Sequence, residues 1–390
     1  METKNLGERA PVIPAKPVSE YLLICGLCGF VSFDAFVFGF DTGTISGFVS
    51  MGNFLERFGK LNDQGVYYFS RTRTGLIVSI FNIGCAIGGI VLSKCADLWG
   101  RRLGLLTAMC IYVVGIFVQI SSLTAWYQCF IGRLITGLAV GTVSVLSPLF
   151  IGETAPKHLI STIVYCCHSM ITFGIFMSYC TTYGTERYPD SKQWRIPLWL
   201  CFAWAFLLMG GIKSKIEEAK QLSPKSYAVY HEIQLIQAGI DREVLAGKPK
   251  IFERVVMGDM LQSLQQLTGN NYFFYYGTTI FKVVGLEDSF QTSIILGVVN
   301  FLSTFAGIYA IERFGRRLCL LAGSSCMSLC FLIYAILSSL HLYINGYSND
   351  PCNTRKSTGN AIIFITCLFI FILASSWAGG CYVSFPRHNH

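Results

Sequence analysis

Long apolar stretches alternate with short polar segments along the whole chain. Ten such stretches lie at 21–42, 75–93, 103–123, 127–150, 160–182, 196–212, 255–281, 290–310, 318–338 and 360–384. Because a helix of about 20 residues crosses a hydrocarbon core of roughly 30 Å, each stretch is long enough to span a membrane. A buried helix of a soluble protein is the alternative for any single stretch, but ten of them leave no polar surface to cover them. We therefore predict an all-α membrane protein with about ten transmembrane helices.

The longest polar segment divides these stretches into six and four. This pattern predicts a cytosolic tail at 1–20, a six-helix bundle at 21–212, a cytosolic loop at 213–254 and an incomplete bundle of helices 7–10 at 255–390. An internal repeat supports two halves, since Asp97–Arg102 reads DLWGRR and Glu312–Arg317 reads ERFGRR, each after the second helix of its half. Alternatively, the arginines of this motif are only the positive charges that keep the cytosolic end of a membrane span in place.

Composition agrees with a chain embedded in lipid. Hydrophobic residues make up 53% and charged residues 13%, and the mean hydropathy is +0.51. Most of the 30 Lys and Arg fall on the side of the N-terminus, which the positive-inside rule makes cytosolic. The net charge of +8 therefore reflects topology, and the absence of a basic run with interleaved aromatic residues argues against a nucleic-acid partner.

The sequence indicates neither an enzyme nor a metal or cofactor site. Its 16 cysteines are scattered through apolar stretches without the spacing of metal ligands, and no nucleophile, base and orienting group form a catalytic set. Glycines four residues apart instead predict close helix contacts, at Gly39, Gly43 and Gly47, at Gly84 and Gly88, and at Gly137 and Gly141.

The seventh stretch carries the strongest polar pattern. Gln262, Gln265, Gln266 and Gly269 fall at i, i+3, i+4 and i+7, so three amides share a helix face. Asn270 and Asn271 follow directly, and together with Gly269 they predict a helix that breaks within the membrane. Amides both donate and accept hydrogen bonds, which suits a neutral polyol such as a sugar. Hydrogen bonding between helices is the alternative role, for these amides and for Asn300.

Charged residues within the apolar stretches form a second candidate group. Asp41 and Arg133 have opposite charges at similar depth, and pairing them lowers the cost of burying either one. The pair is structural or part of a gate, or Asp41 carries a proton. Glu153 lies at the inner end of its helix, where it forms a gate salt bridge with Arg101, Arg102 or Arg316, or remains on the solvated surface.

Several motifs together carry a family resemblance. They are GFDTGTISG at 39–47, the two GRR repeats, Gly132-Arg133 through Pro148 to Glu153-Thr154-Ala155-Pro156, and QQLTGNN at 265–271. This ordered set resembles the sugar-porter family of the major facilitator superfamily, and most of all the fungal hexose transporters. The resemblance implies two six-helix bundles with alternating access and facilitated diffusion of glucose, fructose or mannose across the plasma membrane. It implies no cofactor and no obligate protein partner.

The same resemblance assigns roles to individual residues. Sugar-coordinating positions fall on Gln265, Gln266, Asn271 and Asn300, and the cytosolic gate network falls on Asp97, Arg101, Arg102, Glu153, Glu312, Arg316 and Arg317. His168 stands where the family usually has a sugar-binding Gln, and Ile160-Ser161 replaces the Arg-Gly that follows the gate acid.

The C-terminal residues depart from the family pattern. The chain ends at His390 without the sequences of helices 11 and 12, so we expect a truncated carrier with impaired transport. Two other functions stay open. One is a non-transporting degenerate copy or sensor-like membrane relic, and the other is a proton-coupled sugar symporter that uses Asp41.

Overall fold

The computed structural model describes most of the chain. The described residues are 29–61, 67–69, 71–94, 100–122, 125–154, 160–222, 263–269, 271–274, 289–341 and 352–378, with single residues at 26, 98, 256 and 260. Every structural statement below concerns these residues.

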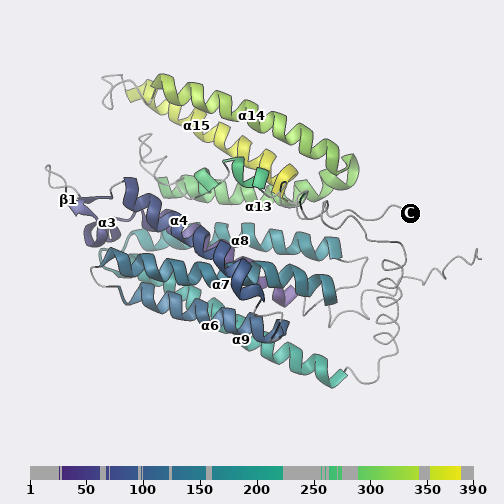
Figure 1. Cartoon of the computed structure of the whole chain (residues 1–390). Helices are drawn as coiled ribbons and strands as arrows, with labels where there is room; N and C mark the ends of the chain where they lie inside the picture. Colours follow the sequence, from purple (N-terminus) through teal and green to yellow (C-terminus); the bar gives the residue numbers. More distant parts are fainter. Residues whose placement is uncertain are drawn as a thin grey trace, which may run out of the picture.

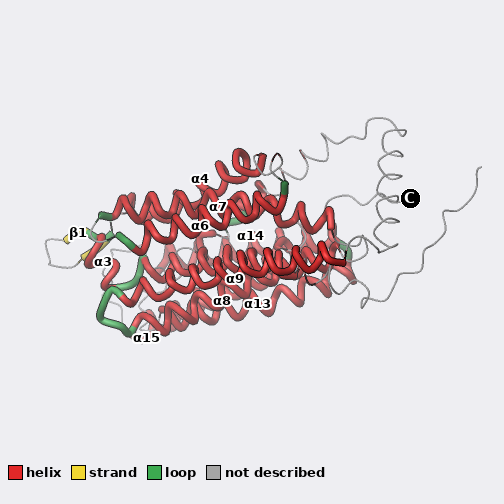
Figure 2. The backbone as a smooth tube through the Cα atoms, turned by 90° about the horizontal axis from the view of Figure 1, so that it is seen from below, coloured by secondary structure: helices red, strands yellow, loops and turns green. Residues whose placement is uncertain are grey.

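Nearly all of the regular structure is helical. The long helices are α2 (Phe33–Phe48), α4 (Arg71–Ile87), α6 (Arg101–Ile120), α7 (Trp126–Thr154), α8 (Ile160–Glu186), α9 (Lys192–Leu222), α13 (Ser289–Phe314), α14 (Arg316–His341) and α15 (Cys352–Leu373). Two π-helical turns, Gly88–Leu92 and Ala374–Ala378, continue α4 and α15. A short helix α3 (Gly52–Phe58) and the antiparallel strands β1 (Lys60–Leu61) and β2 (Tyr67–Tyr68) lie together at one end of the helices (Figures 1 and 2).

Seven described helices are long and apolar enough to cross a membrane. These spans are Thr72–Leu92, Leu103–Ile120, Trp126–Ile151, Lys192–Gly211, Phe290–Ile311, Arg317–Leu337 and Asn360–Trp377. They match seven of the ten predicted stretches and confirm a multi-pass membrane protein. Residues 21–25, 27 and 28 of the first stretch and about half of 255–281 lie outside the described residues. The predicted stretch 160–182 lies in α8, a helix of 27 residues that is not among the seven.

The helices form two groups that follow the sequence. Figure 1 shows α13, α14 and α15 on one side and the helices from α2 to α9 on the other. One apolar core joins α2, α4, α6, α7 and α9, and a second joins α13, α14 and α15. Ile175 and Tyr179 of α8 belong to the second core, and α8 packs directly against α13. The contact between the two groups is therefore made largely by α8.

The repeated GRR motif has the same local structure in both halves. Gly100 and Gly315 adopt positive φ angles of 90° and 80°, and the next helix begins at the following arginine in each case. A side chain at either glycine would meet no atom within 4 Å, so the backbone angle, not space, requires glycine there. This agreement supports two related halves.

Glycines also mark the closest helix contacts, as the four-residue spacing predicts. A Cβ at Gly39, Gly43 or Gly47 of α2 would collide with Ile171, Ser178 or Thr182 of α8. A Cβ at Gly84 or Gly88 would collide with the backbone of α7, and one at Gly137 or Gly141 with the backbone of α4. In lipid, small residues allow backbones to approach closely, so these contacts hold the first group of helices together.

Candidate functional site

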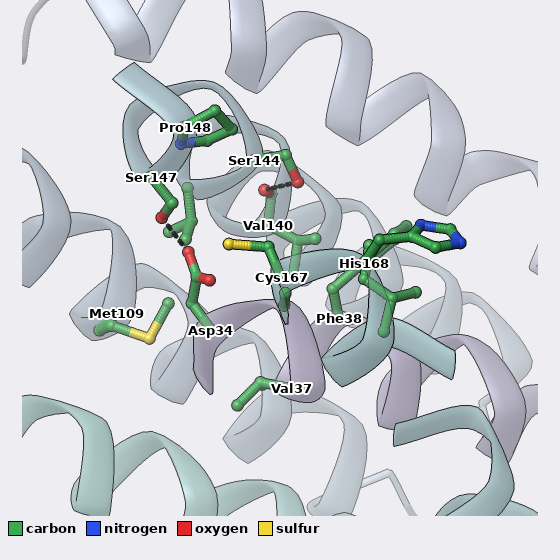
Figure 3. A pocket seen from close by; sticks show the side chains of 13 residues that line it. Asp34, Val37, Phe38, Met109, Val140, Ser144, Ser147, Pro148, Cys167 and His168 are labelled. Atoms are coloured by element: carbon green, nitrogen blue, oxygen red, sulfur yellow. Dashed lines mark hydrogen bonds between the residues drawn. The ribbon is translucent and has the colours of Figure 1, made fainter. Parts of the chain in front are cut away.

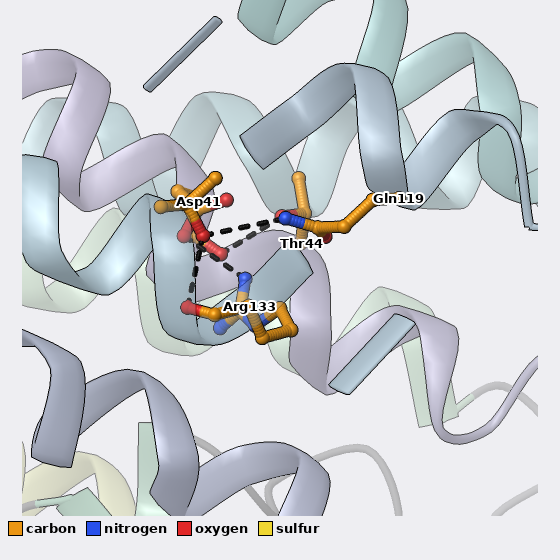
Figure 4. Close-up of polar contacts among 5 residues, drawn as sticks. Asp41, Thr44, Gln119 and Arg133 are labelled. Carbon is orange, nitrogen blue, oxygen red and sulfur yellow. Dashed lines mark hydrogen bonds and ion pairs between the residues drawn. The ribbon is translucent and has the colours of Figure 1, made fainter. Parts of the chain in front are cut away.

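A buried ion pair joins α2 to α7. Arg133 Nη1 donates to Asp41 Oδ2 at 2.9 Å, and the side chains are 1% and 0% exposed (Figure 4). This contact confirms the pairing predicted from the two opposite charges. Because each charge would be costly alone at this depth, the pair ties the two helices to each other.

The surroundings of the pair are only partly polar. The Arg133 guanidinium lies over the ring of Phe81 at 4.5 Å. Gln119, seen near the pair in Figure 4, donates through Nε2 to Thr136 Oγ1 at 3.3 Å. Within the described residues, Asp41 Oδ1 and the Nε and Nη2 atoms of Arg133 have no hydrogen-bond partner. The pair therefore depends on a single strong hydrogen bond and on the attraction of opposite charges.

The seventh predicted stretch breaks where the Gly-Asn pattern indicates. A helical segment at 263–267 ends at Gly269, whose φ is +78°, and a second helical segment covers 271–274. Asn271 Nδ2 donates to Gln266 Oε1 across this break at 2.8 Å, and Gln265 is half-buried one residue earlier. The structure therefore joins two of the predicted sugar ligands at a helix break; Gln262 and Asn270 lie outside the described residues.

The fourth predicted amide lies in the helix that faces α8. Asn300 of α13 is 3% exposed, and the Thr304 hydroxyl, one turn later, donates to its carbonyl. Thr304 and Thr172 of α8 lie 3.4 Å apart, and Tyr179 of α8 donates to the carbonyl of Phe274 at 3.2 Å. These contacts place α8, α13 and the 271–274 segment along the boundary between the two helix groups.

A cavity of about 80 Å³ lies among α2, α6, α7 and α8. His168 lines it, together with Asp34, Phe38, Ser144, Ser147 and Cys167 (Figure 3). Its volume is enough for several water molecules. Of the five predicted sugar ligands His168 lines this cavity and the four amides do not, so a shared sugar site stays a prediction.

Asp34 is a candidate functional residue that none of the sequence motifs indicates. It is 7% exposed, lines the cavity and accepts a hydrogen bond from the Ser147 hydroxyl of α7. One signal was available, since Asp34 precedes Asp41 by seven residues and so falls on nearly the same helix face two turns earlier. The carboxylate lies inside an apolar stretch, where ionisable side chains usually mark a functional site.

The predicted gate residues lie at helix ends. Arg101 and Arg102 begin α6, Glu153 is the penultimate residue of α7, Glu312 is near the end of α13, and Arg316 and Arg317 begin α14. Arg317 is exposed, whereas the side chains of the other five residues and all of Asp97 lie outside the described part of the chain. The gate salt bridges therefore stay a prediction.

Comparisons with known proteins agree with this architecture. The family model described as "Sugar (and other) transporter" matches residues 27–386. Hexose transporter HXT11 of Saccharomyces cerevisiae is 53% identical over 97% of this chain and 72% of its own length. Hexose transporter 2 of Kluyveromyces lactis is 52% identical over 98% of this chain and 73% of its own length.

Solved structures show the same fold. A major facilitator superfamily proton:xylose symporter, XylE, bound to 6-bromo-6-deoxy-D-glucose, has a TM-score of 0.74 at 23% identity, covering 94% of this chain and 82% of its own. A partially occluded, inward-open XylE from Escherichia coli has a TM-score of 0.72 at 23% identity, covering 92% and 86%. At this level of identity the likeness concerns the fold.

Proposed function

Because the chain belongs to the sugar transporter family and has the major facilitator fold, we propose that it carries hexoses across a membrane by alternating access. This proposal depends mainly on one observation: the amino-acid sequence is 53% and 52% identical to two yeast hexose transporters over nearly the whole chain. The chain acts as a transporter and not as an enzyme, and its partners are the sugar and the lipid bilayer. Facilitated diffusion needs no further ligand.

The sugar site is proposed at the boundary of the two helix groups. Gln265, Gln266 and Asn271 lie on the two short helical segments that flank the break at Gly269, and a break of this kind is typical of transporter binding sites. Asn300 of α13 and His168 of α8 would approach the sugar from the facing helices. Amides and an imidazole supply both donors and acceptors, which a hexose with five hydroxyls can use on all sides.

Rocking of one group against the other would expose this site to each side in turn. The proposed halves are 21–212 and 255–390, connected by a cytosolic loop at 213–254. Glu153, Glu312, Asp97 and the arginines at the helix starts would close the cytosolic side by salt bridges. The excess of Lys and Arg on that side supports a cytosolic N-terminus, and uptake of external hexose suits the plasma membrane.

The Asp41–Arg133 pair is proposed to be structural or part of a gate. Both partners are almost fully buried, and Asp41 already has a cation at 2.9 Å. A proton-carrying Asp41 would have to leave this partner uncompensated at each cycle, which is costly. Facilitated diffusion is therefore the favoured mechanism over proton symport.

Uptake of radiolabelled glucose tests the proposal directly. The chain is expressed in yeast cells stripped of their own hexose carriers, and its amount at the plasma membrane is measured by surface labelling. Saturable uptake that is competed by fructose and mannose is the expected result. A chain that reaches the membrane and gives no uptake above vector-only cells would contradict hexose transport.

Removing one site amide is expected to weaken glucose binding. Gln266→Ala removes the acceptor of the Asn271 hydrogen bond and one ligand of the proposed site. A lost hydrogen bond of about 1–1.5 kcal/mol corresponds to a rise of about tenfold in the KM for glucose. Gln291→Ala is the matched control, because Gln291 is an exposed amide of α13 that donates to the Tyr183 hydroxyl away from the helix break. Equal KM values for the two variants would remove Gln266 from the site.

A further inference from the structure

An aromatic cluster joins α3 to α9 at one end of the first helix group (Figure 1). It consists of Phe54 and Phe58 of α3 and Trp194 near the start of α9, whose ring centroids lie between 4.9 and 6.0 Å apart. The backbone N–H of Asn53 also donates to Gln193 Oε1 at 3.1 Å, which holds α3 against α9. These contacts fix the backbones that carry the charged residues around the cluster.

Three arginines from three helices lie beside this cluster. Arg57 of α3 directly precedes Phe58, and Arg73 of α4 donates through Nη1 to the Phe58 carbonyl at 3.4 Å. The guanidinium of Arg195 lies over the Trp194 ring at 5.1 Å. All three arginines are half-buried, so three positive charges gather at this end of the helix group.

The charges of these arginines are not balanced within the described part of the chain. None of the three forms an ion pair there, and Arg57 Nη1 and Arg195 Nε are buried without a hydrogen-bond partner. Glu56, Glu186 and Asp190, the described carboxylates of this end, are exposed. Because a buried donor without a partner is costly, a ligand that supplies anionic acceptor oxygens would stabilise the arginines.

The arginines lie at the ends of membrane spans. Arg73 comes directly after the first residue of the span Thr72–Leu92, and Arg195 lies near the start of the span Lys192–Gly211. The Arg73 guanidinium also lies over the ring of Trp126, the first residue of a third span, at 5.2 Å. Tryptophan is enriched at the depth of the lipid headgroups, so these contacts indicate that the arginines lie at the same depth. The guanidinium fork matches the oxygens of a phosphate group.

We propose that Arg57, Arg73 and Arg195 bind the phosphate of a phospholipid headgroup with net negative charge. Three cations without a paired carboxylate favour an anionic ligand, and their position at the span ends favours a membrane lipid over dissolved phosphate. The site is independent of the proposed sugar transport, because none of these arginines belongs to the proposed sugar site or to its gates.

Native mass spectrometry tests this inference. The full 390-residue chain is purified in detergent and stripped of lipid, and the Kd for one added molecule of phosphatidylglycerol or of phosphatidylcholine is measured. We expect phosphatidylglycerol to bind at least about tenfold more tightly, and inorganic phosphate at equal concentration to leave it bound. In Arg57→Gln/Arg195→Gln the Kd for phosphatidylglycerol is expected to rise by about 10- to 100-fold, because charge-assisted hydrogen bonds are lost.

Two further variants separate this site from general charge attraction. Lys60→Gln/Arg187→Gln removes two exposed cations of the same end, and we expect a smaller rise in Kd. Arg57→Lys/Arg195→Lys keeps both charges without the guanidinium fork, and an intermediate Kd is expected. Thermal midpoints measured without lipid show whether each variant is folded.

The inference is overturned if folded Arg57→Gln/Arg195→Gln binds phosphatidylglycerol as tightly as the unmodified chain or no more weakly than Lys60→Gln/Arg187→Gln. Equal affinity of the unmodified chain for the two lipids would contradict an anionic headgroup. Displacement of phosphatidylglycerol by inorganic phosphate would identify a site for free phosphate and would overturn the assignment to a lipid.

Discussion

Replacing Arg133 by leucine is expected to destabilise the protein more than any change at the sugar site. The substitution leaves Asp41, which is 0% exposed, without its cation and in contact with apolar helices. Breaking a buried pair in this way costs about 3–5 kcal/mol. The expected result is a large fall in the thermal midpoint of the purified protein in detergent, together with loss of the monodisperse peak in size-exclusion chromatography.

The double variant Asp41→Leu/Arg133→Met isolates the charge effect. Apolar residues of similar size can replace a buried pair at little cost, so the double variant should recover most of the lost stability. Uptake by the double variant then distinguishes the two roles of the pair. A structural pair predicts recovery of both stability and uptake, whereas a proton-carrying Asp41 predicts recovery of stability alone. If the single variant were as stable as the unmodified protein, the pair would have no structural role.

Features that depend on local chemistry could be predicted from the sequence. The positive φ at Gly269 follows from a glycine next to two asparagines in an apolar stretch, and the matching turns at Gly100 and Gly315 follow from a repeated motif. The ion pair of Asp41 and Arg133 could be predicted because an unpaired charge is costly at membrane depth and pairing lowers that cost. In each case one strong physical requirement leaves few alternatives.

Features that depend on the arrangement of several helices could not be predicted. Asp34 accepts a hydrogen bond from Ser147, which lies 113 residues later, and nothing in the sequence around either residue specifies this contact. His168 likewise lines a cavity together with residues of α2, α6 and α7, and nothing in its local sequence specifies these neighbours. The resemblance assigns His168, Gln265 and Gln266 to one site, and this assignment stays a prediction, because a resemblance gives positions along a chain and not the direction of each side chain.

Small residues are required where α4 packs against α7. At Gly88, which begins the π-helical turn after α4, an added Cβ would lie 2.7 Å and 2.8 Å from the backbone C and Cα of Leu138. The carbonyl of Gly88 also accepts from the Thr142 hydroxyl at 3.2 Å, so this contact has both steric and polar components. Because the colliding atoms belong to the backbone of α7, no side-chain rotation can relieve the clash.

Gly88→Val is therefore expected to force α4 and α7 apart. Overpacking of this kind costs about 1–3 kcal/mol or more, and separation of the helices would also strain the Asp41–Arg133 pair, whose arginine lies on α7. Gly75→Val is the matched control on α4, because a Cβ at Gly75 meets no atom within 4 Å. Thermal midpoints and glucose uptake are measured for both variants at equal surface expression. We expect a lower thermal midpoint and reduced glucose uptake for Gly88→Val only. Equal midpoints and equal uptake in the two variants would show that α4 and α7 can pack at a wider spacing than these backbone contacts imply.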